Sequence, residues 1–177
     1  SVKSRGLGDV YKRQLGALGY VDAATELLEQ NDDLDVFVVA SGSGATHAGL
    51  LAGLRGSGSK AGVIGSCVRR DAALQGPRIE RALERLCDLY TPANNVTKKD
   101  IRVWDGALAP GYGRIGQRSL EAIRLMASLE GLFLDPVYTA KSFAAVTSLV
   151  ETGDIPKGAK VCFVHTGGLA ALYAYQD

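Results

Sequence analysis

The sequence of 177 residues contains few of the side chains that mark a metal site or a disulfide framework. It has three cysteines, at positions 67, 87 and 162, and two histidines, and none of them stands at the spacing of a metal-binding motif. No apolar run approaches the roughly 18 to 20 residues that a membrane helix requires. These shortages argue against a zinc-bound, disulfide-rich or membrane-spanning protein, so we expect no metal and a cytoplasmic location.

An excess of charge of either sign is also absent. Twenty basic and nineteen acidic residues leave a formal net charge of +1, and the two signs are mixed along the chain. The sequence therefore offers neither a basic face for nucleic acid nor a polybasic segment for a membrane surface. With 46% hydrophobic and 22% charged residues it is typical of a globular domain, and we predict a small molecule as its partner.

The first fourteen residues differ from the rest, because they show no helical or strand periodicity and do not continue into the pattern that follows. We expect residues 1–14 to be a non-native or disordered leader. Residues 15–177 are then one domain or part of one, beginning with a helix that starts at Leu15 and ends near Asn31.

Buried strand-like segments alternate with helix-like segments through the rest of the chain. Such alternation predicts an α/β fold, in which a parallel sheet is covered by helices on both faces. The strands are expected at 36–40, 62–68, 101–104 and 161–164, and further helices at 45–55, 71–90, 117–129, 142–151 and from 167 onward.

A glycine-rich run follows the first strand and opens a helix of small residues. In an α/β protein this position holds phosphate, because glycines let the backbone approach an anion and the N-terminus of the helix dipole lies behind it. A tight strand-to-helix turn without a ligand is the alternative. The candidate phosphate-binding residues are Ser41, Gly42, Ser43, Gly44, Ala45 and Thr46.

Two further polar segments, 135–139 and 165–168, also follow strand-like segments. Because the carboxyl ends of parallel strands share one edge of the sheet, and ligands bind beyond that edge, we expect the three segments to converge on one site.

Six segments in order resemble the branch of the fold-type II pyridoxal-phosphate enzymes that contains D-cysteine desulfhydrase and 1-aminocyclopropane-1-carboxylate deaminase. The resemblance runs from Leu15 to about Tyr175, and it implies a tryptophan-synthase-β-like fold with pyridoxal 5'-phosphate as the cofactor. The segments are LGALGY from 15, SGSGATHAG from 41, APGYG from 109, LEG from 129, LDPVYT from 134 and HTGG from 165.

The resemblance also implies roles for single residues. The loop at 41–46 would hold the cofactor's phosphate, and Thr166 and Gly167 would lie at its ring, with Thr166 beside the pyridine nitrogen. Tyr112 and Tyr138 would face the substrate as catalytic residues, since a phenol can bind the substrate or relay a proton.

Positions within the motifs favour one chemistry of the branch. Thr139 and Thr166 stand where ring-opening deaminases carry glutamate and leucine, and His47 fits the desulfhydrase pattern, so Thr139 and His47 are candidates for the substrate side. The expected reaction is α,β-elimination from D-cysteine or a related β-substituted amino acid to pyruvate, ammonia and sulfide. Alternatives are an L-cysteate sulfo-lyase, an aminocyclopropane carboxylate deaminase, or a phosphate-binding remnant without catalysis.

One family segment is missing from this sequence. The Schiff-base lysine of the family stands in a GGNK-type segment of the N-terminal half, and no lysine here matches it. We interpret Lys141, beside the second tyrosine, as structural. The chain is therefore expected to be the C-terminal part of a lyase whose N-terminal half is missing, and to be inactive alone, while the intact parent forms a homodimer.

Overall fold

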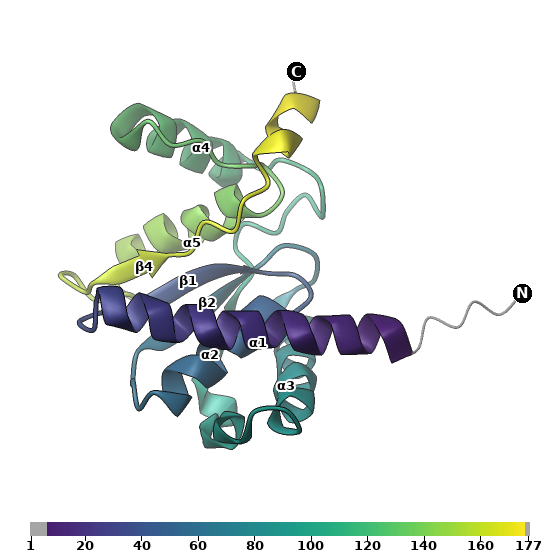
Figure 1. The fold of residues 1–177 in the computed structure, drawn as a ribbon. Coiled ribbons are helices and arrows are strands. Elements are labelled where there is room, and N and C mark those ends of the chain that lie inside the picture. The colour runs from purple at the N-terminus through teal and green to yellow at the C-terminus, as the bar shows by residue number, and fades with distance from the viewer. Residues whose placement is uncertain (1–6, 176–177) are drawn as a thin grey trace, which may run out of the picture.

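The fold is built on a parallel sheet of four strands in the order β3-β2-β1-β4 (Figure 1). The computed structural model describes residues 7–175, with side chains from residue 14 onward. The strands are β1 (Val36–Ser41), β2 (Gly62–Cys67), β3 (Ile101–Trp104) and β4 (Val161–Phe163). All three pairings between neighbouring strands are parallel, so their carboxyl ends lie at one edge.

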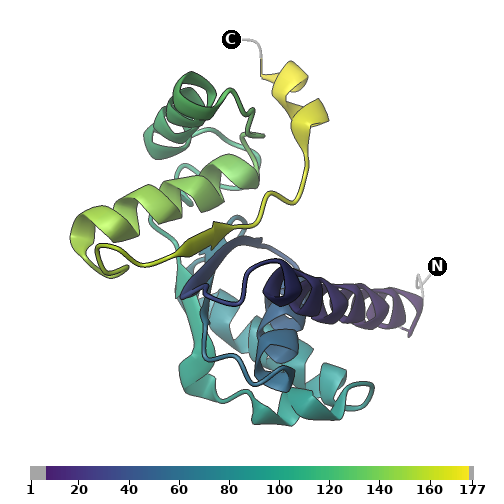
Figure 2. The same cartoon turned by 60° about the vertical axis from the view of Figure 1, so that its left-hand side comes forward.

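Helices cover both faces of this sheet, as the two views in Figures 1 and 2 show. On one face lie α1 (Leu7–Gln30), α2 (Ala45–Gly56) and α3 (Ala72–Cys87). On the other lies α5 (Thr139–Thr152), against which α4 (Gln117–Glu130) packs. Short 3-10 segments complete the chain: η1 (Thr91–Asn95), η2 (Lys98–Asp100) and η3 (Leu169–Ala174). The predicted fold class is confirmed.

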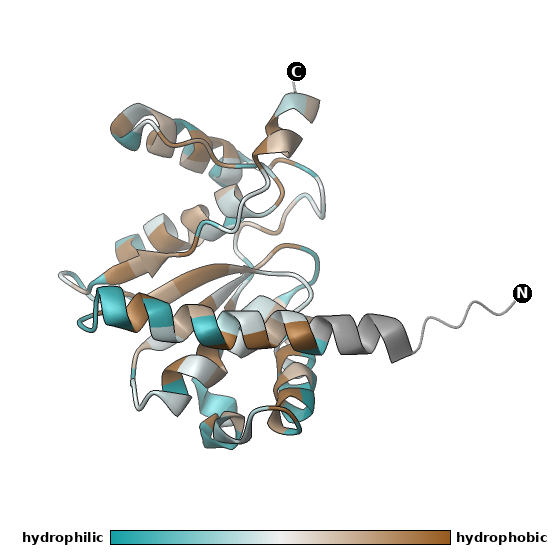
Figure 3. Ribbon diagram, viewed as in Figure 1, coloured by the Kyte–Doolittle hydropathy of each residue, from teal (hydrophilic) through white to brown (hydrophobic). Residues whose placement is uncertain are grey.

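The two cores follow from the alternation of side chains along the strands. Phe37 and Val39 of β1 are fully buried among the helices of the first face. Val36 and Val38 belong to the cluster that α5 covers. Because both faces are covered, the central strand β1 carries a continuous apolar run, and most of it is brown in Figure 3.

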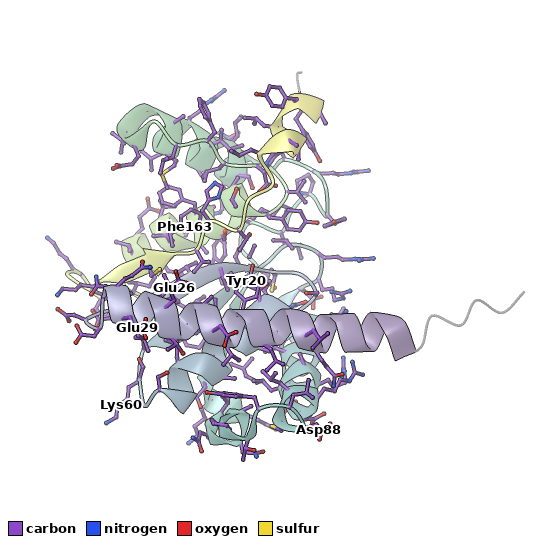
Figure 4. The ribbon with its side chains drawn as sticks, viewed as in Figure 1. Tyr20, Glu26, Glu29, Lys60, Asp88 and Phe163 are labelled. Atoms are coloured by element: carbon purple, nitrogen blue, oxygen red, sulfur yellow. The ribbon has the colours of Figure 1, made fainter. Side chains whose placement is uncertain are left out.

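Two glycines allow α1 to lie directly against α2. A Cβ at Gly49 would stand 2.2 Å from the carbonyl oxygen of Ala17 and 2.7 Å from the Cβ of Tyr20, which is labelled on α1 in Figure 4. A Cβ at Gly53 would stand 2.7 Å from the Cβ of Ala24. This close packing fixes α2, and with it the loop that precedes α2.

Three details of the sequence prediction need correction. The first helix begins at Leu7 rather than Leu15, so residues 7–14 of the expected leader are helical, while residues 1–6 lie outside the described residues. The fifth helix begins at Thr139 rather than Ser142, because Asp135 caps its first turn. The last segment is a 3-10 helix. Within the described residues, no helix is both long and apolar enough to cross a membrane.

Candidate active site at the carboxyl edge of the sheet

The glycine-rich loop connects β1 to α2 at the carboxyl edge of the sheet. Gly44, the residue before the first turn of α2, has φ +88°, a left-handed conformation that favours glycine. The first-turn N–H groups of α2 have no acceptors within the helix, and the positive end of its dipole lies there. The loop therefore has the local structure of an anion-binding turn.

Side chains at the start of α3 hold this loop in place. Gln75 is fully buried and donates a hydrogen bond from Nε2 to Ser41 Oγ at 2.9 Å. Arg70 donates to the Gly42 carbonyl oxygen at 2.9 Å, and Arg78 donates to that of Ser43 at 2.9 Å. These bonds occupy carbonyl oxygens that would otherwise repel an anion.

A cleft of about 370 Å³ lies between this loop and the chain that follows β4. Residues from all three predicted segments line it, so the structure brings those segments together. The lining residues are Ala40, Gly42, Ser43, Thr46, Tyr138, Thr166, Gly167 and Gly168.

A larger cavity, of about 670 Å³, lies at the opposite, amino edge of the sheet. Its walls include carboxylates of Glu29, Asp32, Asp33 and Asp35, together with Lys60; Glu29 and Lys60 are labelled in Figure 4. A wall of carboxylates disfavours a phosphate, and parallel sheets bind ligands at the other edge. The smaller cleft is therefore the candidate site.

Asp135 organises the wall of the cleft that faces the glycine loop. Its Oδ2 accepts hydrogen bonds from the N–H groups of Val137 and Tyr138 at 2.8 and 2.9 Å, and its Oδ1 accepts from that of Thr139 at 2.7 Å. Gly168 lies against it with φ +98°, and a Cβ there would stand 2.8 Å from Asp135 Cγ. The aspartate thus sets both Tyr138 and the glycine pair after β4.

Tyr112 and Tyr138 form a hydrogen-bonded pair, although 26 residues separate them in the chain. Their hydroxyl oxygens are 2.6 Å apart, and their rings meet edge to face with centroids 6.2 Å apart. The hydrogen bond with Tyr112, followed by desolvation, raises the pKa of Tyr138 to about 12. The phenol of Tyr138 is therefore protonated at neutral pH.

Lys141 is buried beneath the loop that carries Tyr112. Its Nζ donates hydrogen bonds to the carbonyl oxygens of Gly111 at 2.7 Å and Leu108 at 3.1 Å. Burial lowers the pKa of this amine below its usual range. Lys141 does not line the cleft, and its contacts support the interpretation of it as a structural residue that positions Tyr112.

The two candidates for the substrate side lie outside the cleft lining. Thr139 is fully buried, and its hydroxyl both donates to Asp135 Oδ1 and accepts from the Asp135 N–H, each at 2.7 Å. His47 is fully buried in α2, where desolvation lowers its pKa to about 4. Neither side chain lines the cleft, because both face the interior, and their assignment to the substrate side stays a prediction.

Sequence reasoning missed several residues that shape the site. An aspartate shortly before a helix can accept hydrogen bonds from the N–H groups at the helix start, so Asp135, four residues before Thr139, could have been found from the segment LDPVYT. Gln75 and Arg70 reach the loop across 34 and 28 positions of the chain, and no local pattern indicates such contacts.

Comparison with known proteins agrees with this geometry. Residues 4–167 match the protein family described as "Pyridoxal-phosphate dependent enzyme". The chain is 40% identical over 167 residues to proteins named D-cysteine desulfhydrase from Klebsiella pneumoniae (strain 342) and from Salmonella newport (strain SL254). Each match covers 91% of this chain and 49% of the relative.

Solved structures show the same relationship. A crystal structure of a homologue of aminocyclopropane carboxylate (ACC) deaminase matches with a TM-score of 0.80 and 31% identity, over 92% of this chain and 48% of the other. Maize serine racemase matches with a TM-score of 0.57 and 17% identity, over 89% and 52% of the two chains, and shares the fold. The chain spans about half the length of the curated relatives it matches. By its sequence match and its fold, it belongs to the family of pyridoxal-phosphate dependent enzymes.

Proposed function

We propose that the protein containing this chain is a pyridoxal-phosphate-dependent lyase. It catalyses α,β-elimination from D-cysteine or a related β-substituted amino acid, giving pyruvate, ammonia and sulfide. The observation that carries the proposal is one cleft that combines a phosphate-type glycine loop, the segment Thr166-Gly167-Gly168 and a tyrosine from a hydrogen-bonded phenol pair. The 40% identity to D-cysteine desulfhydrases supports the choice of substrate.

The residues of the cleft fit the cofactor. The left-handed Gly44 and the first turn of α2 would bind the phosphate, with hydroxyls of Ser43 and Thr46 as further donors. Gly167, with φ +91° and no atom within 4 Å of the place where a Cβ would stand, leaves room beside a flat ring. When bound, pyridoxal phosphate supplies an electron sink for the carbanion that forms at the substrate's α-carbon.

Thr166 would bind the ring nitrogen of the cofactor through a neutral hydroxyl. A hydroxyl can donate a hydrogen bond but cannot place a negative charge beside a protonated nitrogen, so the nitrogen stays uncharged. A weakly withdrawing ring suits elimination, because the leaving group carries the electron pair away.

The phenol pair would act on that leaving group. Because the pKa of Tyr138 is raised to about 12, its O–H group is retained at neutral pH and can donate a proton to the departing sulfur. Tyr112 orients this hydroxyl through the 2.6 Å hydrogen bond. The proposed catalytic residues are therefore Tyr112 and Tyr138, and the other predicted residues of the cleft hold the cofactor.

We further propose that the chain needs the rest of its protein for catalysis. No lysine nitrogen lines the cleft in the described part of the chain. A segment equivalent to the unmatched half of the relatives would supply the lysine that bonds to the cofactor. The intact protein is proposed to be a cytoplasmic homodimer.

A chimeric enzyme tests the proposed function. In this chimera, residues 15–177 of the present chain replace the half of the Klebsiella pneumoniae D-cysteine desulfhydrase that they match. The other half of that enzyme is retained. We expect pyruvate and sulfide from D-cysteine, and no product from this chain alone. In the chimera, Tyr138→Phe should lower kcat by about 10²-fold or more, the lower range for loss of a general acid. Tyr173→Phe, at an exposed position, is the matched control.

The products separate the alternatives. Release of sulfite from L-cysteate in preference to sulfide from D-cysteine would indicate a sulfo-lyase. Ring opening of 1-aminocyclopropane-1-carboxylate would indicate the deaminase, a reaction named for the homologue of the solved structure. A folded, cofactor-loaded chimera that yields none of these products would refute the lyase.

A further inference from the structure

Arg69 stands at the carboxyl end of β2, beside the phenol pair. Its Cζ lies 5.5 Å from the centroid of the Tyr112 ring, in the geometry of a cation–π contact. The Tyr112 hydroxyl bonds in turn to Tyr138, which lines the cleft. The guanidinium is therefore connected through the phenol pair to the lining of the cleft.

This cation lacks a charged partner among the side chains at 14–175, since none of their ion pairs includes Arg69. Two carboxylates near the end of β2 are already used by the backbone of α3. Asp71 Oδ1 accepts from the Leu74 N–H at 2.9 Å, and Asp105 Oδ2 accepts from the Ala72 N–H at 2.9 Å. The neighbouring Arg70, in contrast, donates to Gly42 within the loop.

We propose that Arg69 binds an oxyanion of the amino-acid substrate. The inference rests on the proposed function. It adds that the tyrosine side of the cleft selects a negatively charged group of the substrate. A guanidinium binds carboxylates and sulfonates through paired N–H donors, and an exposed side chain can turn to meet them. Its positive charge also acts on Tyr138, whose pKa it lowers against the larger opposing causes.

Two groups of a substrate could supply the oxyanion. One is the α-carboxylate, which every amino acid carries, and the other is a sulfonate on the β-carbon. For the second source, cysteate and water give pyruvate, ammonium and hydrogen sulfite: the C–S bond breaks, and sulfur leaves with its electron pair. No oxidant or reductant takes part in this step.

The test compares substrates in the chimeric enzyme. Arg69→Gln removes the charge, and Arg69→Lys keeps it without the planar fork. Arg124→Gln, on an exposed position of α4, is the control. The substrates are L-cysteate, D-cysteine and D-β-chloroalanine, which has a neutral leaving substituent, and kcat and KM are measured for each.

A sulfonate at Arg69 predicts that Arg69→Gln lowers kcat/KM for cysteate by about 10- to 100-fold, as for loss of a charge-assisted hydrogen bond. The value for β-chloroalanine would change by less than about 3-fold, and Arg69→Lys would recover part of the loss. An α-carboxylate predicts instead an equal rise in KM for all three substrates. Unchanged kcat/KM for all three substrates in Arg69→Gln would overturn the proposal.

A binding measurement keeps this inference separate from the proposed function. In the ¹⁵N-labelled chain, the Arg69 Nε–Hε resonance, assigned through the Arg69→Gln variant, would be followed while methanesulfonate or acetate is added. We expect a saturable shift that is absent for the Arg124 resonance. A linear shift of equal size in the Arg69 and Arg124 resonances would show an effect of salt screening alone. It would contradict anion binding at Arg69 even if the chimera were active.

Discussion

The two walls of the cleft are built in different ways. The glycine-loop wall is continuous with the core, since Ser41, Gln75 and His47 behind it are all buried. The tyrosine wall stands on loops and helix starts, and Tyr112 and Tyr138 are 49% and 37% exposed. A wall set by the core should hold a constant group such as a phosphate, whereas side chains on loops can vary with the substrate. Substitutions should therefore cost stability on the first wall and alter chemistry on the second.

The largest expected effect concerns the buried histidine behind the glycine loop. His47 has no hydrogen-bond partner on either ring nitrogen, and burial lowers its pKa from 6.5 to about 4. As pH falls from 6.5 to 4, the unfolded chain takes up a proton that the folded chain does not. Stability present above pH 6.5 is therefore lost across this window, by about 3 kcal/mol at about 1.4 kcal/mol per pKa unit.

Urea unfolding of the chain between pH 4 and 7 measures this loss. His47→Leu should flatten the pH dependence by about that amount while leaving the parallel sheet folded, as circular dichroism would show. An unchanged slope in the variant would mean that other groups carry the acid sensitivity and that His47 remains accessible to protons.

The next effect concerns the glycine that faces this histidine in β2. A Cβ at Gly65 would stand 2.3 Å from His47 Nδ1 and 2.8 Å from Ser41 Cβ. Gly65→Ala should therefore destabilise the chain by about 2 kcal/mol, within the range for overpacked cores. Gly76→Ala, in α3, meets nothing within 4 Å and should instead stabilise it by about 0.5 to 1 kcal/mol. Equal effects in urea unfolding would refute the tight packing behind the loop.

A smaller effect is expected on the tyrosine wall from Lys141→Met. The variant removes both hydrogen bonds to the loop carbonyls of Leu108 and Gly111. It also removes the desolvation cost of keeping a charged amine buried. The net loss of stability should therefore be only about 1 kcal/mol. The loop at residues 105–116 should become more sensitive to protease, which limited proteolysis would detect. Lys157→Met, at an exposed turn, is the control.

Local patterns were enough to predict most of the fold. The alternation of apolar runs located all four strands, because strands buried on both faces are continuously hydrophobic. The start of α1 was missed because residues 7–14 lack an apolar stripe, yet they continue a helix whose later turns pack on α2. The start of α5 depends on the cap from Asp135, which extends the helix by one turn.

Prediction of the site was more uneven. The glycine loop and the HTGG segment carry their own backbone signal, and each follows a strand of a parallel sheet, so their place at one cleft could be predicted. The burial of Thr139 and His47 could not be predicted, because a motif shows which residues are present but not which way each side chain points. The contact between Arg69 and Tyr112 joins two loops, and no spacing in the sequence indicates it.

The smallest effect on stability, and the sharpest on chemistry, is expected from Tyr112→Phe. The variant removes the hydrogen bond that is the largest cause of the raised pKa of Tyr138, so this pKa should fall from about 12 toward 10. Stability at neutral pH should change by less than about 1 kcal/mol, since the lost partner is exposed to water. In the parent chain the raised pKa adds stability below pH 10 that is lost as pH rises toward 12, and the variant should lack this loss. Tyrosinate absorbance in a pH titration measures the change, with Tyr173→Phe as the exposed control.

The same variant separates two effects of Tyr112 on kcat of the chimera. A phenol near its ordinary pKa is a stronger proton donor than one near 12, so kcat would fall only if orientation by Tyr112 matters more than acidity. A rise in kcat would show that Tyr112 restrains Tyr138, and that the tyrosine wall is tuned by acidity.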